Sequence, residues 1–400
     1  MAVAKNEESS QAVSPMTKIM RQINKTYGRG TIMTADFVSK VNIPRIGTGI
    51  WIADKALGGG LPVGRISLVY GDKSTGKTTF YIRAVANAQR MCANCYRRAV
   101  LVPGKVLSHD PNTDESFLVD SMVVGSCECG SPRSFNIAWV DQEGTWDPNW
   151  AAAHGVIKER LVITRPQFAE EAVDIVAGLI ETEGSADIVV LDSIAQMSPI
   201  KEIEDSATEF AGHPGMTARL MGAAVRKWNS GLQARFRKSL DKDYMDVPSV
   251  WLVNQIRLKI GIAFGSPETT PGGKAVGFAT SVEIRTAPGQ YKVDDKLMET
   301  YHVELGFKVN KNKTAPARQG GKYKICVMAH GPYTKGQVMD HSDVLFHGLR
   351  LGVIEQVTER KIRLGDDEYM GKKALVDYWA ANPDVYETVK EMVLQRALAD

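Results

Sequence analysis

A short glycine-rich motif constrains the fold of this 400-residue chain more than any other feature. It fits the pattern G-x-x-x-x-G-K-[ST], and it lies between a β-branched apolar run and a helix-length segment, which is the context that the pattern requires. Its glycines let the backbone curl so that amide N–H groups face phosphate oxygens, and the positive end of the following helix adds to the attraction. The motif predicts a phosphate-binding loop, and its residues are Gly71, Asp72, Lys73, Ser74, Thr75, Gly76, Lys77 and Thr78, with Thr79 next to it.

The loop predicts ATP and Mg²⁺ as ligands. Lys77 is expected to neutralise the β- and γ-phosphates, and the Thr78 hydroxyl to bind Mg²⁺. Asp192 and Glu143, each just beyond a later apolar run, are expected to hold the metal's water shell and to activate the attacking water. Asp192 alone has an ordinary alternative, which is a strand-end acid that caps the next turn, and Glu143 alone is a weak signal. Together they favour a catalytic site, because ligands of open parallel sheets gather at the carboxyl ends of the strands.

Short apolar runs alternate with helix-length segments from about residue 45 onward. The runs are β-branched, as strands buried on both faces should be, and they are Ile66–Tyr70, Ile137–Val140, Leu161–Thr164, Ile188–Leu191 and Val250–Val253. The helical segments include Lys77–Arg90, Phe168–Glu181 and Met216–Trp228. The alternation predicts an α/β fold with a mostly parallel central sheet covered by helices.

The last third of the chain has a different texture. An antiparallel extension of the sheet is expected at Ser281–Arg285, His302–Val309 and Tyr323–Met328. Helical stretches at Asp340–Leu349 and Lys373–Ala397 flank a short charged hairpin and predict a small C-terminal α+β domain. The expected division is an N-terminal arm with a helix at 1–45, an ATPase core at 46–335 and the C-terminal domain at 336–400.

Charge and hydropathy exclude several classes of protein. The net charge is only +3, which excludes a uniformly basic nucleic-acid coat, so any DNA contact must use local patches or backbone amides. No stretch of about 18 apolar residues occurs, so no membrane span is expected. The polar start of the chain lacks an apolar signal core, which favours a cytoplasmic protein.

Residues 91–135 interrupt the alternation and are too many for an ordinary connection. They hold four of the five cysteines, Cys92, Cys95, Cys127 and Cys129, in two close pairs separated by a stretch long enough for a small hairpin. Four thiolates without an open position would form a structural Zn²⁺ site, whose metal would supply the folding energy of a segment too small for its own core. The alternative is four free cytosolic cysteines. The charges of the segment are balanced, so a strong DNA contact is not expected there.

A helix is predicted from the Ser14-Pro15 start to Tyr27, since serine caps helix N-termini and proline suits the first helical position. Its apolar residues share one face and are Met16, Ile19, Met20, Ile23 and Tyr27. An isolated helix of this length is marginal, so this face needs a partner. Two partners remain open: the chain's own core or a neighbouring subunit.

Several stretches closely resemble the bacterial RecA recombinases. Met20 to Met33 resembles the family's polymerisation helix and its exit, and Leu57 to Arg65 resembles the approach to its phosphate loop. Asp141-Gln142-Glu143 matches the stretch that carries the catalytic glutamate, and the resemblance places Asp147 and Trp150 against the adenine. Lys73 and Asp72 depart from the family, which usually has an acidic residue and a proline there.

The resemblance is most specific in Asn254 to Gly273, which matches the family's second DNA-binding loop. It implies that Gln255 senses the γ-phosphate, and that Lys311 and Lys313 reach the ATP of the neighbouring subunit. Without the resemblance, the two lysines would be an ordinary solvated strand end. The region from Lys201 to Gly215 resembles the first DNA loop. The implied DNA-binding residues are Met216, Arg219, Arg226, Arg257, Ile260, Phe264, Gly272, Gly273 and Lys274.

These residues suit the extended DNA strand that strand exchange needs. Glycine-loop amides and a few arginines hold phosphates without reading sequence. Ile260 and Phe264 would brace the stretched strand, unless they fold into a small core of their own loop.

The resemblance implies an ATPase that forms a helical filament on single-stranded DNA and exchanges strands with homologous double-stranded DNA. Two alternatives remain open, a RecA-fold DNA translocase or helicase and a non-catalytic, ATP-gated coat on single-stranded DNA. The second loop argues against the helicase, and Glu143 with Gln255 argues against the passive coat.

Overall fold

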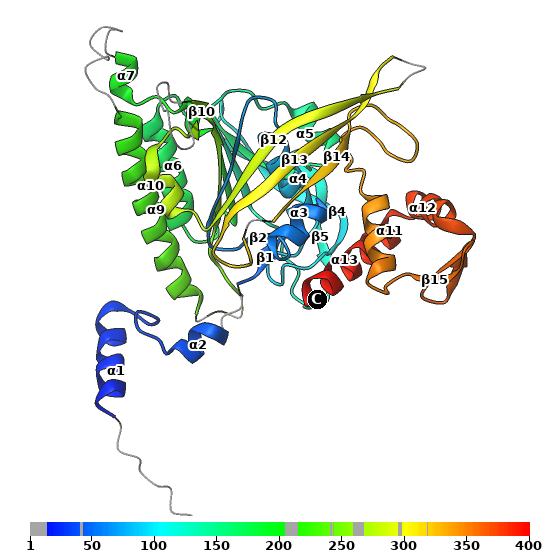
Figure 1. Ribbon diagram of the computed structural model, residues 1–400. Helices are drawn as coiled ribbons and strands as arrows, with labels where there is room; N and C mark the ends of the chain where they lie inside the picture. The colour runs from blue at the N-terminus through cyan, green and yellow to red at the C-terminus, as the bar shows by residue number, and fades with distance from the viewer. Residues whose placement is uncertain are drawn as a thin grey trace, which may run out of the picture.

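The computed structural model describes residues 14–40, 43–204, 215–240, 242, 244–258, 268–294, 298–317 and 319–400. Its centre is an eight-stranded sheet (Figure 1). In spatial order the strands are β14 (Gly320–Cys326), β13 (Thr300–Asn312), β12 (Val282–Val293), β3 (Ile66–Gly71), β9 (Ser249–Gln255), β8 (Ile188–Asp192), β6 (Ile137–Asp141) and β7 (Val162–Thr164). The five predicted strands are confirmed as β3, β6, β7, β8 and β9, and their pairings are all parallel.

The prediction of an antiparallel extension is partly wrong. The predicted run Ser281–Arg285 lies in β12, apart from Ser281 itself. β12 pairs parallel to β3, with Val282 opposite Ser67. The helix α10 (Gly273–Ala279) crosses between the end of β9 and the start of β12, so β12 enters the sheet in the same direction. Only β13 is reversed, and it pairs antiparallel with both β12 and β14.

Helices cover both faces of the sheet, as the apolar strands require. On one face, α3 (Trp51–Leu57) and α4 (Lys77–Ala88) pack against alternate strand residues such as Val190 and Trp251. On the other face, α6 (Ala169–Glu181), α9 (Met216–Ser239) and α10 pack against the intervening residues, such as Leu191 and Leu252. The predicted helices at 77–90 and 168–181 are therefore confirmed, while the one from Met216 is longer than predicted.

The C-terminal residues form a separate small core beside the sheet. Its elements are α11 (His341–Arg350), β15 (Glu355–Thr358), β16 (Lys361–Leu364), β17 (Asp367–Tyr369), α12 (Gly371–Ala381) and α13 (Pro383–Ala399). The single helical stretch predicted at 373–397 is wrong, because Asn382 leaves the helical conformation before Pro383 and α13 starts anew. Trp379 and Val393 pack with Trp51 of α3, which joins this C-terminal module to the core.

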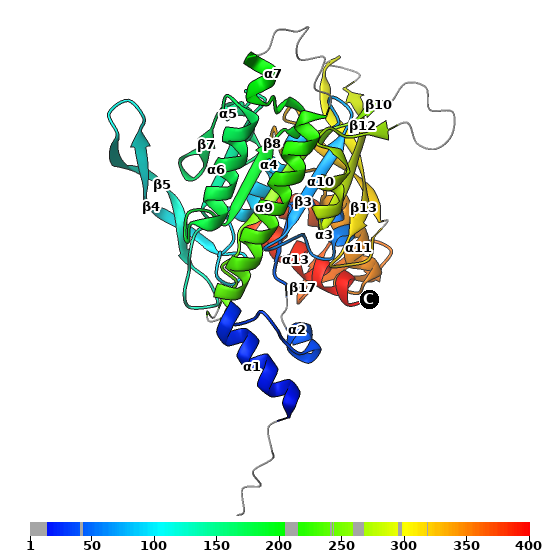
Figure 2. The same cartoon turned by 90° about the vertical axis from the view of Figure 1, so that its left-hand side faces the viewer.

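Two elements project from the molecule. The strands β4 (Val100–Asp110) and β5 (Glu115–Ser126) pair antiparallel in a long ribbon (Figure 2), which confirms the hairpin predicted within 91–135. The helix α1 (Pro15–Tyr27) stands away from the sheet, together with α2 (Ala35–Lys40) (Figure 1). The predicted cap is confirmed, since Ser14 Oγ accepts the Thr17 N–H at 3.2 Å.

The apolar face of α1 is not packed on its own core. None of its residues is buried within the described chain, and the side chains of Met16 and Tyr27 are 64% and 69% exposed. The first of the two possible partners is therefore excluded by the described residues. No helix in the described part of the chain is long and apolar enough to cross a membrane.

Candidate functional site: nucleotide, DNA and metal positions

The phosphate loop joins β3 to α4 in the conformation that phosphate binding requires. Gly76 precedes α4 with φ of +78°, a left-handed conformation that favours glycine, and a Cβ there would also displace the end of the Leu305 side chain, whose Cδ1 would lie 2.6 Å away. Thr75 is buried, and its Oγ1 donates to the Asp72 carbonyl at 2.8 Å and lies 2.7 Å from Thr286 Oγ1 on β12. The loop is thus held from beneath, while Asp72, Lys73 and Ser74 are exposed above it.

Lys77 and Thr78 lie in the first turn of α4. Lys77 Nζ donates to the Asp72 carbonyl at 2.6 Å, which keeps its ammonium within the loop. Burial lowers the pKa of Lys77 below its ordinary value, while the charges of Glu143 and Asp192 act in the opposite direction. The lysine that the motif assigned to phosphate therefore lies among the carboxylates predicted from the later strands.

Asp192 ends β8 beside Thr78. Its Oδ2 accepts the Thr78 hydroxyl at 2.8 Å, and its buried Oδ1 has no hydrogen-bond partner among the described residues. Burial raises the pKa of Asp192 to about 7, and Glu143 and Asp141 add to the shift. A buried carboxylate oxygen with no partner, beside a threonine hydroxyl, fits Mg²⁺ and its water shell.

Glu143 lies just beyond β6 on the adjacent strand end. The backbone amides of Gln142 and Glu143 donate to the Asp192 carbonyl at 2.8 and 3.2 Å, and the Ser193 hydroxyl donates to Glu143 Oε2 at 3.3 Å. Sequence reasoning missed Ser193, although its place directly after Asp192 was a usable signal. The bonds orient the Glu143 carboxylate at the same edge of the sheet as the phosphate loop.

The predicted adenine residues lie at the start of α5 (Pro148–Ala153). Asp147 caps this helix, and its Oδ1 accepts the amides of Asn149 and Trp150 at 2.8 and 3.1 Å. Trp150 Nε1 donates to Thr79 Oγ1 at 3.4 Å, which brings the ring beside the first turn of α4. A partly exposed ring next to a phosphate loop suits stacking on a base.

Gln255 ends β9 directly beside the phosphate loop. It pairs in register with Gly71, and the next amide, that of Ile256, donates to the Gly71 carbonyl at 3.1 Å. The chain then enters β10 (Arg257–Leu258), which pairs with β11 (Glu268–Thr269) at the base of the predicted second DNA loop. The phosphate loop and the segment after Gln255 are therefore joined through the backbone.

Two helix N-termini meet where the two predicted DNA loops end. The residue before α9 is Gly215 and the residue before α10 is Gly272, both with positive φ, and a Cβ on Gly273 would lie 3.0 Å from Ala218 Cβ. Neither first turn holds an acidic residue. Adjacent helix N-termini with free amides attract phosphate.

The predicted DNA-binding side chains surround these N-termini in part. Arg219 is in the first turn of α9, Arg226 is exposed two turns further along it, and Lys274 is exposed in the first turn of α10. Met216 begins α9, and Arg257 lies on β10 with its Nη2 3.5 Å from the Ala195 carbonyl. Ile260 and Phe264 lie outside the described residues, as does most of the first loop after α7 (Ile200–Glu204).

Lys311 and Lys313 do not join the phosphate loop of their own chain. Lys311 Nζ donates to the Gly277 carbonyl and lies 3.6 Å from Glu283 Oε1, and Lys313 Nζ donates to the Phe278 carbonyl at 3.4 Å. In the sheet, Lys311 on β13 pairs with Glu283 on β12, which pairs with Leu68 on β3. Lys311 therefore lies two strands away from β3, and about 10 Å from Gly71 along the strand direction. Because β13 is reversed, Lys313 lies still further from the loop.

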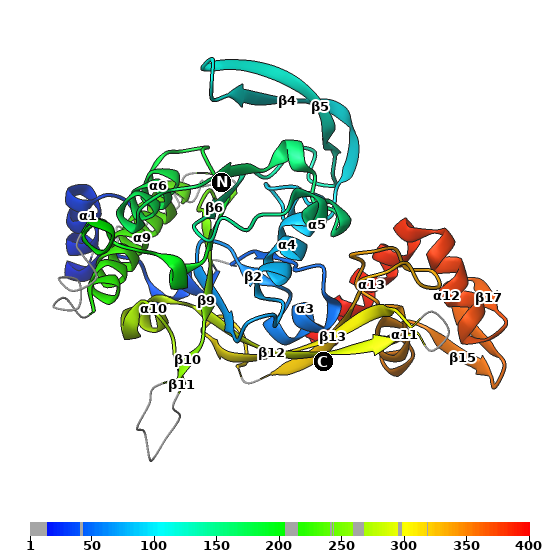
Figure 3. The same ribbon diagram turned by 90° about the horizontal axis from the view of Figure 1, so that it is seen from above.

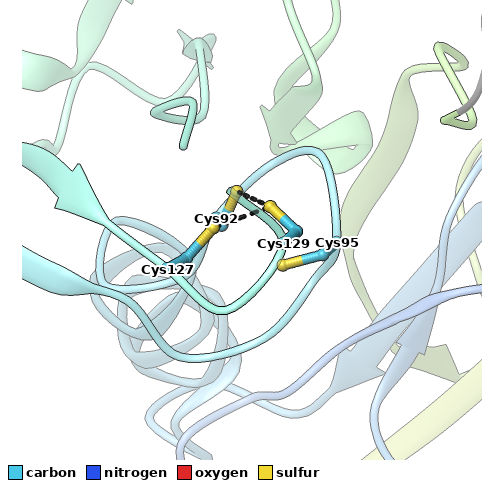
Figure 4. Close-up of side chains that lie close together, drawn as sticks. All are labelled: Cys92, Cys95, Cys127 and Cys129. Atoms are coloured by element: carbon cyan, nitrogen blue, oxygen red, sulfur yellow. Dashed lines mark hydrogen bonds between the residues drawn. The ribbon is translucent and has the colours of Figure 1, made fainter. Parts of the chain in front are cut away.

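The four predicted cysteines converge at the base of the ribbon. Their sulfur atoms all lie within 4.8 Å of one another (Figure 4). Four sulfurs about 2.3 Å from one tetrahedral ion would be ~3.8 Å apart, and Cys92 Sγ is 3.8 Å from Cys129 Sγ. Cys127 Sγ is 2.7 Å from Cys129 Sγ, so these two would move apart on binding a metal. Although burial acts to raise it, backbone amides of Arg133, Asn94 and Cys95 lower the pKa of the Cys92 thiol to about 6. The four residues can hold a metal ion.

Known proteins match this chain over nearly its whole length. The family model described as the RecA N-terminal domain matches residues 14–99 and 126–331, and the gap between these ranges falls on the β4–β5 ribbon. Protein RecA of Teredinibacter turnerae is 31% identical over 375 residues, covering 93% of this chain and 90% of that protein. Protein RecA of Nostoc punctiforme is 31% identical over 396 residues, covering 98% and 92%. Protein RecA of Pseudomonas fluorescens is 31% identical over 380 residues, covering 94% and 89%.

Proposed function

This chain belongs to the RecA family, whose members are DNA-dependent ATPases of recombination and repair, and we propose that it exchanges homologous DNA strands as a filament on single-stranded DNA. One observation carries the proposal. The phosphate loop, Asp192, Glu143 and Gln255 meet at the carboxyl ends of four neighbouring strands, and the chain leaves Gln255 straight into a DNA loop. ATP turnover and DNA binding therefore share one edge of the sheet.

In the nucleotide site, each group has one task. The loop amides and Lys77 bind the phosphates, and Thr78 with Asp192 would hold Mg²⁺, whose charge neutralises phosphate oxygens. Glu143, oriented by Ser193, orients the attacking water and accepts its proton. Trp150 stacks on the adenine, with Asp147 beside it.

Gln255 and Gly71 couple nucleotide to DNA. A γ-phosphate in the loop would contact Gln255, and the bond from the Ile256 amide to Gly71 would pass the change to β10 and β11. DNA phosphates would bind at the N-termini of α9 and α10, where Met216, Gly272 and Gly273 lie. The cationic side chains around these N-termini are Arg219, Arg226, Arg257 and Lys274. Ile260 and Phe264 of the intervening loop would brace the extended strand.

The filament would complete the site between subunits. Lys311 and Lys313 would reach the ATP of a neighbouring copy, since within their own chain they lie away from the phosphate loop. The exposed apolar face of α1 would bind a neighbouring core. We assign residues 1–45 to this arm, 46–335 to the ATPase core and 336–400 to the C-terminal domain.

We further propose that the four cysteines hold a structural Zn²⁺. A two-stranded ribbon on its own is marginally stable in water, and a metal at its base would close it. The family model matches the chain on both sides of the ribbon but not the ribbon itself, which supports a local addition to the fold.

An ATPase assay with single-stranded DNA tests the site. Lys77→Ala should abolish hydrolysis, because the main cation on the γ-phosphate is lost, and Glu143→Gln should bind ATP but turn it over about 100-fold more slowly or worse. Lys158→Ala, which removes an exposed lysine of the η1 turn (Lys158–Arg160), serves as the control and should be normal. Normal turnover in either site variant would refute the assignment of that residue.

A further inference from the structure

A cavity of about 330 Å³ lies between α4 and the C-terminal module. Arg83 on α4, with Arg90 and Arg98 in the segment after it, lines one side of the cavity. The other side is lined by Tyr386, Glu387 and Lys390 of α13. Figure 3 shows the C-terminal module standing beside the core on this side. The ATP and DNA sites use none of these residues.

The charges of this cavity do not balance. Arg98 is paired with Glu387 at 3.2 Å and Lys390 with Asp340 at 2.7 Å, which occupies the two carboxylates of the cavity wall. Arg83 and Arg90 form no ion pair with any carboxylate of the described chain. They contact backbone carbonyls instead: Arg83 Nη1 donates to His154 O at 2.8 Å, and Arg90 Nη1 donates to Gly155 O at 2.7 Å.

Polar atoms in the same wall also lack partners. Arg83 Nε and His341 Nδ1 are buried without a hydrogen bond among the described residues. Burial and the charge of Arg83 lower the pKa of His154 to about 3, so its ring is neutral at physiological pH. Burial also lowers the pKa of Arg83, whose charge is weakly solvated here. Unpaired buried guanidinium groups and orphaned nitrogens are rare unless something else satisfies them.

We propose that this cavity binds a small phosphate-bearing anion between Arg83 and Arg90, and that the bound anion fixes the C-terminal module to the ATPase core. The planar guanidinium group matches phosphate oxygens better than any other side chain, and two of them here have no carboxylate partner. A volume near 330 Å³ admits pyrophosphate or a nucleoside monophosphate. Because α4 begins at Lys77, the occupant would also contact the helix that carries the phosphate loop.

The inference goes beyond the proposed recombinase activity, and binding measurements test it separately. Full-length protein carrying Lys77→Ala, which weakens the phosphate loop, would be titrated calorimetrically with inorganic pyrophosphate and with adenosine monophosphate. One site per chain is expected for at least one probe, and the tighter probe distinguishes an inorganic from a nucleotide ligand. No binding of either probe would overturn the proposal.

Three further variants locate the site. Arg83→Gln should weaken binding at least tenfold, while Arg350→Gln, an exposed arginine of α11 outside the cavity, should leave it unchanged. Glu387→Gln removes a carboxylate from the wall and frees Arg98, so it should tighten binding, a gain that a merely unfolded variant could not show. Unchanged affinity in both Arg83→Gln and Glu387→Gln would place the anion elsewhere and refute the inference.

Discussion

At the scale of single residues, the groups around a buried carboxylate decide whether it suits chemistry or fixes structure. Asp192 is buried with one free oxygen beside a hydroxyl, which suits a metal ion and its waters. Asp54 on α3 is equally buried, but its Oδ1 accepts the Thr48 amide at 2.6 Å and so fixes the preceding loop. The two carboxylates differ in what surrounds them rather than in depth.

Asp54 should make the stability of the protein depend on pH. Burial raises its pKa from 3.8 to about 7, so the folded state holds this proton more tightly than the unfolded state. Its stabilising contribution is full below pH 3.8 and is lost as pH rises through about 7. Asp54→Asn should therefore gain stability relative to wild type between about pH 5 and about pH 8, on the order of a few kcal/mol.

Urea unfolding of both proteins at the two pH values measures this difference. Asp366→Asn, at an exposed position of the C-terminal module, should show no such gain and serves as the control. If the difference between Asp54→Asn and wild type were the same at both pH values, Asp54 would not be the group responsible.

At the scale of elements, the sequence predicted those that carry a periodic or positional signal. The five parallel strands are apolar runs whose alternate residues pack on the two faces of the sheet, and the phosphate loop is encoded in eight consecutive residues. The direction of β12 was not predictable, because it depends on the path of α10 across the sheet rather than on local composition. The cavity around Arg83 was equally hidden, since it joins residues about 300 positions apart in the chain.

The β4–β5 ribbon is the element whose stability is least explained by its own packing. Leu107 and Leu118, paired across the ribbon, are 70% and 61% exposed. The base of the ribbon, by contrast, is closed by the four cysteines and by Arg160 of η1, whose Nη1 donates to Met122 O at 3.2 Å. The order of the ribbon should therefore depend on the metal.

Purified protein should carry about one zinc per chain by elemental analysis. Cys92→Ser combined with Cys127→Ser should remove it and expose residues 100–126 to limited proteolysis, while ATP binding persists because the phosphate loop lies elsewhere. Cys326→Ser, at the buried cysteine of β14 outside the cluster, should keep the zinc. Metal-free wild-type protein with a protease-resistant ribbon would contradict the zinc assignment.

At the scale of the whole molecule, two features of a single chain suit a contact with another copy. The apolar face of α1 is exposed, and Lys311 and Lys313 lie away from their own phosphate loop. A head-to-tail contact between copies would complete both, and such contacts repeat without closing in a helical filament. The family resemblance identifies these lysines in the sequence, but only the strand register shows that they lie away from the phosphate loop of their own chain.

Mixing two inactive variants tests whether the lysines act between subunits. Lys311→Ala and Lys313→Ala should each lower DNA-stimulated ATPase activity without unfolding the protein. Mixed with Lys77→Ala subunits in equal amounts, either should recover part of the activity, because about a quarter of random junctions join an intact loop to intact lysines. A mixture of Lys311→Ala with the Lys77→Ala/Lys311→Ala double variant has no intact junction and should stay inactive. Absence of rescue at every mixing ratio would argue against a shared site.

Strand exchange between circular single-stranded DNA and a linear duplex tests the central claim most directly. With ATP and Mg²⁺, the protein should convert a homologous duplex into joint molecules and leave a heterologous duplex intact, because base pairing rather than the protein reads the sequence. Lys77→Ala should form none. Unwinding of both duplexes regardless of homology would identify a helicase, and binding to the single strand without any joint molecules would identify a passive coat; either result would contradict the recombinase assignment.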